Sequence, residues 1–162
     1  MANTKETRIK INSELYEVDA SLFSDVTDDV DFFESDKDTA EPEILEINTV
    51  GKITCENERI TISYEESEAT GMEGSLTSLT FLKNEPGIVT MTRNGIVSAT
   101  LVFEEGKRHH CIYKTPFMPF EVCIHTKKVV NLLDFGNTLE LDYIVEIRGA
   151  KAERTKFKMQ IL

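Results

Sequence analysis

The sequence predicts an all-β protein, an antiparallel up-and-down barrel of about 8–10 strands. Apolar and polar residues alternate along much of the chain, which is the pattern of half-buried strands. Short turn-forming sequences separate these segments, and no helical pattern of about 10–15 residues lies between successive strands. An open sheet of this size would leave two long apolar edges, so we expect the sheet to close. With 162 residues, the chain fits a single domain, residues 1–162.

The first two strands are predicted around residues 8–12 and 45–53. Ile9 and Ile11 alternate with polar and charged neighbours. Leu45, Ile47 and Ile53 fall on one face of the second strand. Residues two apart in a strand point to the same side of the sheet, so these side chains are candidates for the interior.

The same alternation marks four further segments, at residues 60–64, 97–103, 137–147 and 155–162. One face of each segment is apolar, which is typical of a strand with a core on one side. The predicted barrel interior therefore comprises Ile60, Ile62, Leu101, Phe103, Leu139, Leu141, Val145, Phe157, Met159 and Ile161.

Turn-forming residues connect the predicted strands. Asn94-Gly95 lies between two apolar runs and predicts a two-residue hairpin turn of type I′, in which both residues have positive φ. Further turns are predicted at residues 104–107, 116–118, 135–137 and 149–151, each of which contains glycine or proline.

The negative charge of the chain is concentrated in an acidic insertion, residues 19–42. The net charge is −11, and residues 17–46 hold 12 acids and one base, whereas the other residues hold 17 of each. Two interpretations stay open. The insertion is either a solvated acidic loop or a short amphipathic helix, because Phe23, Val26, Val30 and Phe33 recur at helical spacing. As a helix it would cover one mouth of the barrel as a lid able to open.

The second half of the chain contains a series of spaced motifs. They are Arg93-Asn94-Gly95, Phe103 with Gly106, Tyr113-Lys114-Thr115-Pro116-Phe117 with Phe120, and Leu139, Leu141 and Tyr143. From about Gly51 to the C-terminus, the sequence resembles the YwiB-like family of small, uncharacterised bacterial β-barrel proteins. The resemblance implies a calycin-like (lipocalin-type) barrel without an established activity. Met118 stands where the family usually has glycine, and the chain has no tryptophan for a lipocalin Gly-x-Trp signature.

A ligand in such a barrel would meet the motif residues that lie on or beside apolar strands. These candidate ligand-binding residues are Arg93, Tyr113, Thr115, Phe120 and Tyr143. Arg93 would pair with an anionic group of the ligand, and the tyrosines would line the cavity. The alternative stays open that Arg93 is a surface or cross-strand-paired residue and that the tyrosines pack in a filled core.

Catalytic motifs are missing from the sequence. The sequence contains no Gly-x-Ser-x-Gly motif, no His-Glu-x-x-His motif and no phosphate-binding glycine loop. Its three histidines are His109, His110 and His125. The acidic pairs Glu65-Glu66 and Glu104-Glu105 are expected on the solvated surface. We therefore expect a protein that is not an enzyme and that needs no cofactor.

Two histidines and two cysteines form a candidate cluster whose existence depends on strand register. If residues 116–118 form a three-residue loop, Cys111 faces Cys123 and His109 faces His125 on one surface. These are ligand types that zinc uses, and the cysteines alone would make a redox-sensitive pair. A slip of one residue removes both arrangements. The preferred interpretation is that all four are ordinary residues of a sheet face, with no metal site.

Composition also limits the partners and the compartment. An acidic surface disfavours nucleic acid and anionic membranes as partners. The odd number of cysteines and the absence of a signal peptide or a long apolar span predict a cytoplasmic protein. The favoured function is non-catalytic binding of a small apolar or amphipathic ligand in the barrel. The alternative is an interaction or structural protein with a filled barrel, which engages a partner through the acidic insertion. The oligomeric state stays open.

Overall fold

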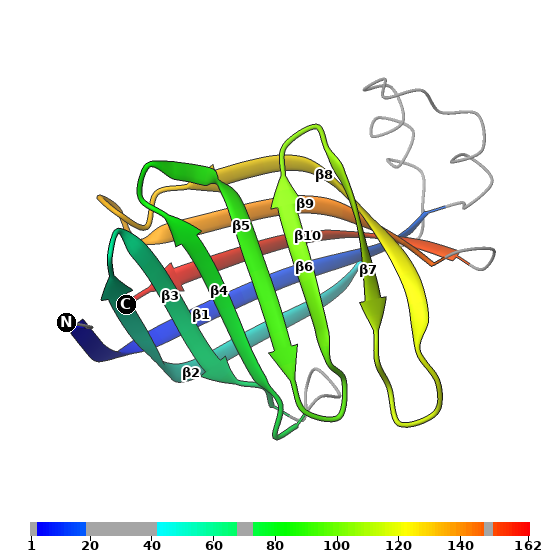
Figure 1. Cartoon of the computed structure of the whole chain (residues 1–162), viewed down its shortest axis with the longest axis horizontal. Coiled ribbons are helices and arrows are strands. Elements are labelled where there is room, and N and C mark those ends of the chain that lie inside the picture. Colours follow the sequence, from blue (N-terminus) through cyan, green and yellow to red (C-terminus); the bar gives the residue numbers. More distant parts are fainter. Residues whose placement is uncertain (1–2, 19–41, 68–72, 148–150) are drawn as a thin grey trace.

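The computed structural model describes residues 3–18, 42–67, 73–147 and 151–162, and these residues form ten strands (Figure 1). The described residues contain no helix, and all strand pairs are antiparallel, which confirms the predicted all-β barrel. The strands are β1 (Asn3–Val18), β2 (Glu43–Glu56), β3 (Arg59–Glu65), β4 (Leu76–Leu82), β5 (Glu85–Asn94), β6 (Ala99–Glu104), β7 (Arg108–Tyr113), β8 (Phe120–Asn131), β9 (Thr138–Ile147) and β10 (Lys151–Ile161).

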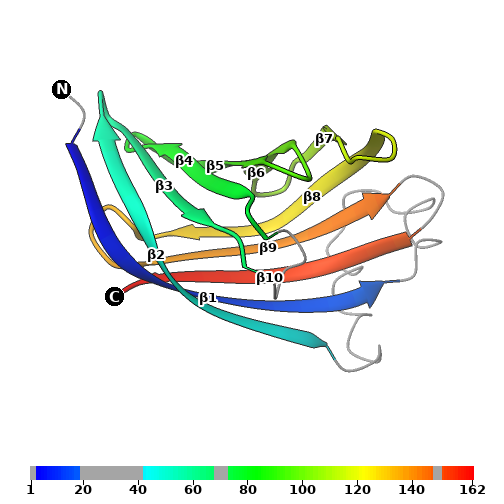
Figure 2. The same cartoon turned by 90° about the horizontal axis from the view of Figure 1, so that it is seen from below.

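The ten strands form one sheet in the order β6-β5-β4-β3-β2-β1-β10-β9-β8-β7. Every neighbouring pair is consecutive in sequence except β1 and β10, which join the two ends of the chain in the middle of the sheet. Their ladder places Ile11 opposite Met159 and Ser13 opposite Phe157. Figure 2 shows the sheet curling so that β3 to β6 face β1, β10, β9 and β8 across the interior.

The two edge strands, β6 and β7, meet along a seam. A single bridge joins them there, in which the backbone N–H groups of Ser98 and Lys114 each donate to the other residue's carbonyl at 2.9 Å. At the opposite end of the seam, the N–H of Gly106 donates to the carbonyl of Thr126 on β8 at 2.9 Å. These few bonds bring the edges together, so the sheet is a nearly closed barrel.

The interior is a packed apolar core along much of the barrel. Eight of the ten predicted interior residues are buried, and the other two, Val145 and Ile161, are half-buried and pack against the same core. The alternation of apolar residues therefore identified the inner face correctly. The fully buried side chains also include Leu79, Val89 and Met91, which lie on β4 and β5 between segments that were predicted as strands.

The predicted type I′ turn at Asn94-Gly95 is wrong. Arg93 and Ala99 are the last paired residues of the β5–β6 hairpin, so residues 94–98 form a five-residue loop. Gly95 has a φ of 157°, and Asn94 does not have positive φ. Asn57 and Glu58 form the two-residue turn with positive φ at both positions, 50° and 65°, between the paired residues 56 and 59.

Gly95 is required for a close approach of two loops. A Cβ atom at Gly95 would lie 2.8 Å from the Cα atom of Ser75, which is fully buried just before β4. The side chain of any other residue would therefore collide with the backbone that precedes β4. This packing, and not hairpin geometry, accounts for a glycine at position 95.

Several predictions concern residues outside the described part of the chain. The acidic insertion, residues 19–42, is described only at Pro42, so the helix and the lid over one mouth of the barrel stay predictions. The turn at 149–151 also falls largely outside the described residues. Met118 does not have positive φ, so it does not adopt the left-handed conformation that would favour glycine at this position. The described residues contain no helix that is long and apolar enough to cross a membrane.

Candidate functional site

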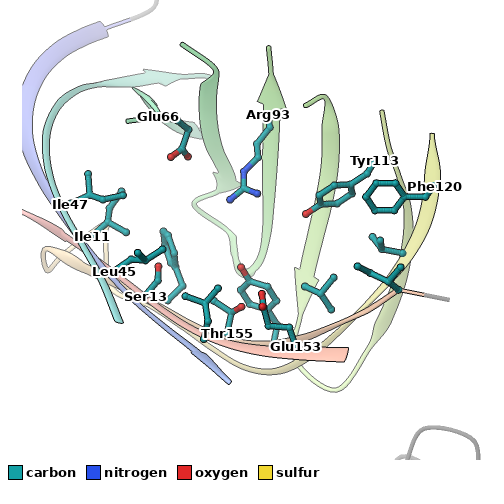
Figure 3. Close-up of a pocket in the computed structure, with 16 residues that line it drawn as sticks. Ile11, Ser13, Leu45, Ile47, Glu66, Arg93, Tyr113, Phe120, Glu153 and Thr155 are labelled. Carbon is teal, nitrogen blue, oxygen red and sulfur yellow. The ribbon is translucent and has the colours of Figure 1, made fainter. Parts of the chain in front are cut away.

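One end of the barrel is hollow. A cavity of about 360 Å³ lies where β1 ends and β2 begins (Figure 3). Core side chains fill the interior toward the other end. Apolar side chains make most of its wall. The lining residues are Ile11, Ser13, Leu15, Leu45, Ile47, Glu66, Arg93, Tyr113, Phe120, Val122, Tyr143, Val145, Ile147, Glu153, Thr155 and Phe157.

The structure brings four of the five predicted ligand-binding residues to this cavity: Arg93, Tyr113, Phe120 and Tyr143. Thr115 lies outside the cavity, in the loop between β7 and β8. Its hydroxyl donates to the carbonyl of Met118 at 2.8 Å and accepts the N–H groups of Phe117 and Met118 at 3.3 and 3.2 Å. The Thr115 side chain therefore shapes the loop, as short hydroxyl side chains commonly do.

Arg93 is the cation of the cavity wall. It lies near the end of β5, between its ladder partners Thr77 and Ala99, and its side chain points into the cavity (Figure 3). Its Nε atom is buried and has no hydrogen-bond partner among the described residues. Burial lowers the pKa of Arg93, but Tyr113, Tyr143, Tyr64 and Glu66 around it outweigh this effect, so the guanidinium stays charged.

Tyrosine hydroxyls surround the guanidinium. Burial raises the pKa of Tyr113, raises that of Tyr143 to about 12, and raises that of Tyr64 still further. The three phenols are therefore neutral at physiological pH and cannot cancel the charge of Arg93. Aromatic neighbours hold two of the rings in place: Tyr143 lies 4.5 Å from Phe103, and Tyr113 stacks on Phe120 at 5.5 Å, measured between ring centroids.

Glu66 is a buried residue of the site that sequence reasoning missed. It follows β3 directly, it is 5% exposed, and its Oε1 atom accepts a hydrogen bond from the Thr77 hydroxyl at 2.7 Å. The expectation that Glu65 and Glu66 are both solvated is therefore wrong for Glu66. The signal was present, because Glu66 continues the inward-facing alternation of Ile60, Ile62 and Tyr64.

A second carboxylate, Glu153, lies on the opposite wall with Thr155 (Figure 3). Both residues continue the inward face of β10 that Phe157 and Met159 define. Sequence reasoning missed both residues. It began the strand at residue 155, which left Glu153 outside the strand, and it did not consider Thr155 as an inward-facing residue. The cavity thus combines one cation, two carboxylates and several phenol and hydroxyl groups with an apolar wall.

The candidate cluster of histidines and cysteines does not form, because the β7–β8 register differs by one residue from the register that the cluster requires. Cys111 pairs with Val122, His110 with Cys123 and His109 with Ile124. Lys114 bonds to Ser98 across the seam instead of continuing the β7–β8 ladder, so the loop spans residues 114–119. The side chains of His109 and Cys111 are therefore directed to the barrel interior. Those of Cys123 and His125 lie on the other face of the sheet, where His125 is nevertheless buried. In the described part of the chain, no three His, Cys, Asp or Glu residues are placed to hold a metal ion.

Comparison with known proteins gives the family. Residues 32–159 match the model of a domain of unknown function, DUF1934. This chain belongs to the DUF1934 family. No match is found among curated proteins. The fold of this DUF1934 chain is similar to the crystal structure of ywiB protein from Bacillus subtilis, with a TM-score of 0.64 and 18% sequence identity over 98% of this chain and 95% of that chain. The similarity confirms the predicted resemblance to YwiB.

Proposed function

We propose that this DUF1934 protein is a non-catalytic binding protein that holds one small apolar or amphipathic molecule in its barrel. The observation that supports this proposal is the cavity of about 360 Å³. Ligand pockets of proteins commonly measure about 300–1,000 Å³ and combine apolar walls with a few polar groups that fix orientation. The cavity has both properties.

The contrast between the two ends of the barrel supports the same proposal. One end is filled by large side chains such as Phe103, Met159 and Leu139, none of which is exposed. At the other end, Ser13 and Thr155 occupy inward positions where larger apolar residues would fill the space. The alternative function, that of an interaction protein with a filled barrel, has less support because this end is hollow.

The thiols fit a reducing compartment. Cys55, Cys111 and Cys123 are all free. Unpaired cysteines are typical of cytoplasmic proteins, so we propose that this protein is cytoplasmic.

The proposal is tested with N-phenyl-1-naphthylamine, an uncharged apolar probe whose fluorescence rises in an apolar site. We expect saturable binding of one probe per chain. Val145 lines the cavity, so Val145→Phe should occupy its space and weaken binding at least tenfold. Val50 is 59% exposed and lies outside the cavity, so Val50→Phe is the matched control and should bind normally. Equal binding by both variants would place the probe elsewhere and overturn the proposal.

A further inference from the structure

We infer that the ligand carries a single anionic group and that Arg93 binds this group inside the cavity. The inference rests on the proposed function and adds the chemical class of the ligand: a small amphipathic monoanion, such as a carboxylate or sulfonate with an apolar body. Two observations support it. The Arg93 side chain points into the cavity, and the nearby carboxylate Glu66 is hydrogen-bonded to Thr77 and not to Arg93.

One N–H group of the Arg93 guanidinium is available to bind a ligand. The Nε atom of Arg93 is buried without a hydrogen-bond partner among the described residues, although the side chain points into the cavity (Figure 3). A buried polar group without a partner is unfavourable, and a buried charge more so. An anion in the cavity would accept from this donor, and charge-assisted bonds of this kind are among the stronger ones in proteins.

The neighbours of Arg93 do not replace such an anion. Tyr64, Tyr113 and Tyr143 are neutral phenols at physiological pH. Glu66 is the nearby carboxylate, but its Oε1 atom is held at 2.7 Å by the Thr77 hydroxyl, and no ion pair between Glu66 and Arg93 is present in the described residues. Glu66 therefore balances the charge through space and leaves the Nε donor available.

The two carboxylates of the wall set an upper limit on the ligand's charge. Glu66 and Glu153 both line the cavity, so they would repel a second negative charge on the ligand. The remainder of the ligand meets Ile11, Leu45 and Ile47, which form an apolar wall (Figure 3). A ligand with one anionic group and an apolar body therefore matches both the charged and the apolar part of the cavity.

Two matched probes test this inference on the intact protein. The first is N-phenyl-1-naphthylamine, and the second is 8-anilino-1-naphthalenesulfonate, which has the same ring system with one sulfonate added. We expect the sulfonate to bind at least about tenfold more tightly in buffer of about 0.15 M ionic strength. The protein's own net charge of −11 opposes this preference, so general electrostatic attraction cannot produce it.

Three variants assign the preference to one side chain. Arg93→Met should lose the preference, so that the sulfonate binds no more tightly than the neutral probe, and an unchanged circular dichroism spectrum shows that the variant folds. Arg93→Lys should keep part of the preference, because it retains the charge but not the planar donor. Arg8 is exposed and lies outside the cavity, so Arg8→Met should behave like the original protein.

The outcomes separate the two proposals. If neither probe binds in the barrel, the proposed function fails and the inference fails with it. If the neutral probe binds but the sulfonate binds no more tightly, or if Arg93→Met keeps the preference, only the inference is overturned.

Discussion

Cys111 lies opposite Val122, one residue out of line with Cys123, so the two thiols point to opposite faces of the β7–β8 hairpin. Cys111 packs against the core, and burial raises the pKa of its thiol to about 11. Cys123 borders a surface hollow together with Arg108, His110 and Glu146. A backbone that separates the two sulfur atoms prevents a disulfide without a change of register.

This relationship predicts that mild oxidation of the folded protein with diamide forms no Cys111–Cys123 disulfide. The measurement is peptide mass spectrometry after digestion under non-reducing conditions. Iodoacetamide should modify Cys111 slowly at neutral pH, because the thiolate is the reactive form. Unfolded protein treated in the same way is the control. A native 111–123 disulfide would show that the register described above is wrong.

The core assignment predicts a large cost for Leu141→Ala. Leu141 is 2% exposed on β9, and removing its buried methyl groups should lower the free energy of unfolding by about 2–5 kcal/mol. Ile44 on β2 is 66% exposed, so Ile44→Ala should change it by less than about 0.5 kcal/mol. Denaturant unfolding measures both. A Leu141 variant as stable as the Ile44 variant contradicts the assignment of the barrel interior.

Glycine at position 95 should be hard to replace. Gly95→Val adds a β-branched side chain at a φ of 157° and drives its Cβ atom to 2.8 Å from the Cα atom of Ser75. We expect the free energy of unfolding to fall by about 1–3 kcal/mol. Gly87 lies on β5, just before the loop that contains Gly95. It has no atom within 4 Å of a Cβ position and no positive φ, so Gly87→Val is the control. Equal effects would remove the packing argument.

The buried phenols predict a loss of stability at alkaline pH. Burial raises the pKa of Tyr143 from 10.0 to about 12 and also raises the pKa of Tyr64 and Tyr113. Above pH 10 the unfolded chain loses these protons first, so it binds fewer protons than the folded chain. The contribution of Tyr143 to stability is therefore complete below pH 10 and is lost as the pH rises through about 12.

Phenolate absorbance checks this prediction, because the chain contains no tryptophan to overlap with its four tyrosines. The folded protein should ionise its tyrosines at higher pH than the same protein in denaturant. Tyr143→Phe should reduce the fall of unfolding free energy between pH 10 and 12. Coincident titration curves for the folded and denatured protein would mean that the phenols are not buried.

Alternation was enough to identify the barrel and most of its inner face, because burial on one side of a strand imposes a period of two on the sequence. The predictions of the β7–β8 register and of the turn at Gly95 were wrong because a single backbone contact between distant residues determines each of them. Lys114 pairs with Ser98 across the seam, which shifts the β7–β8 register and separates the histidines and cysteines. Gly95 is fixed by Ser75, a residue 20 positions earlier, so local turn rules misassigned it.

The candidate site was predicted only in part for a different reason. Arg93, Tyr113, Phe120 and Tyr143 were found through motifs, whereas Glu66 and Glu153 are carboxylates at inward positions that general burial preferences assign to solvent. A strand pattern followed through a charged residue would have found both. Thr115 belongs to the same motif as Tyr113, but its position in the loop takes it away from the cavity.

The order of the strands divides the chain into two consecutive blocks. Strands β1 to β6 make one continuous half of the sheet and β7 to β10 the other, and the turn after Glu104 is the covalent link between β6 and β7. The ladder from Ile9–Ile161 to Val18–Ala152 joins the blocks on one side and the seam joins them on the other. A chain cut in that turn would therefore yield two fragments with complementary edges, and the barrel could be reconstituted from them as a split protein.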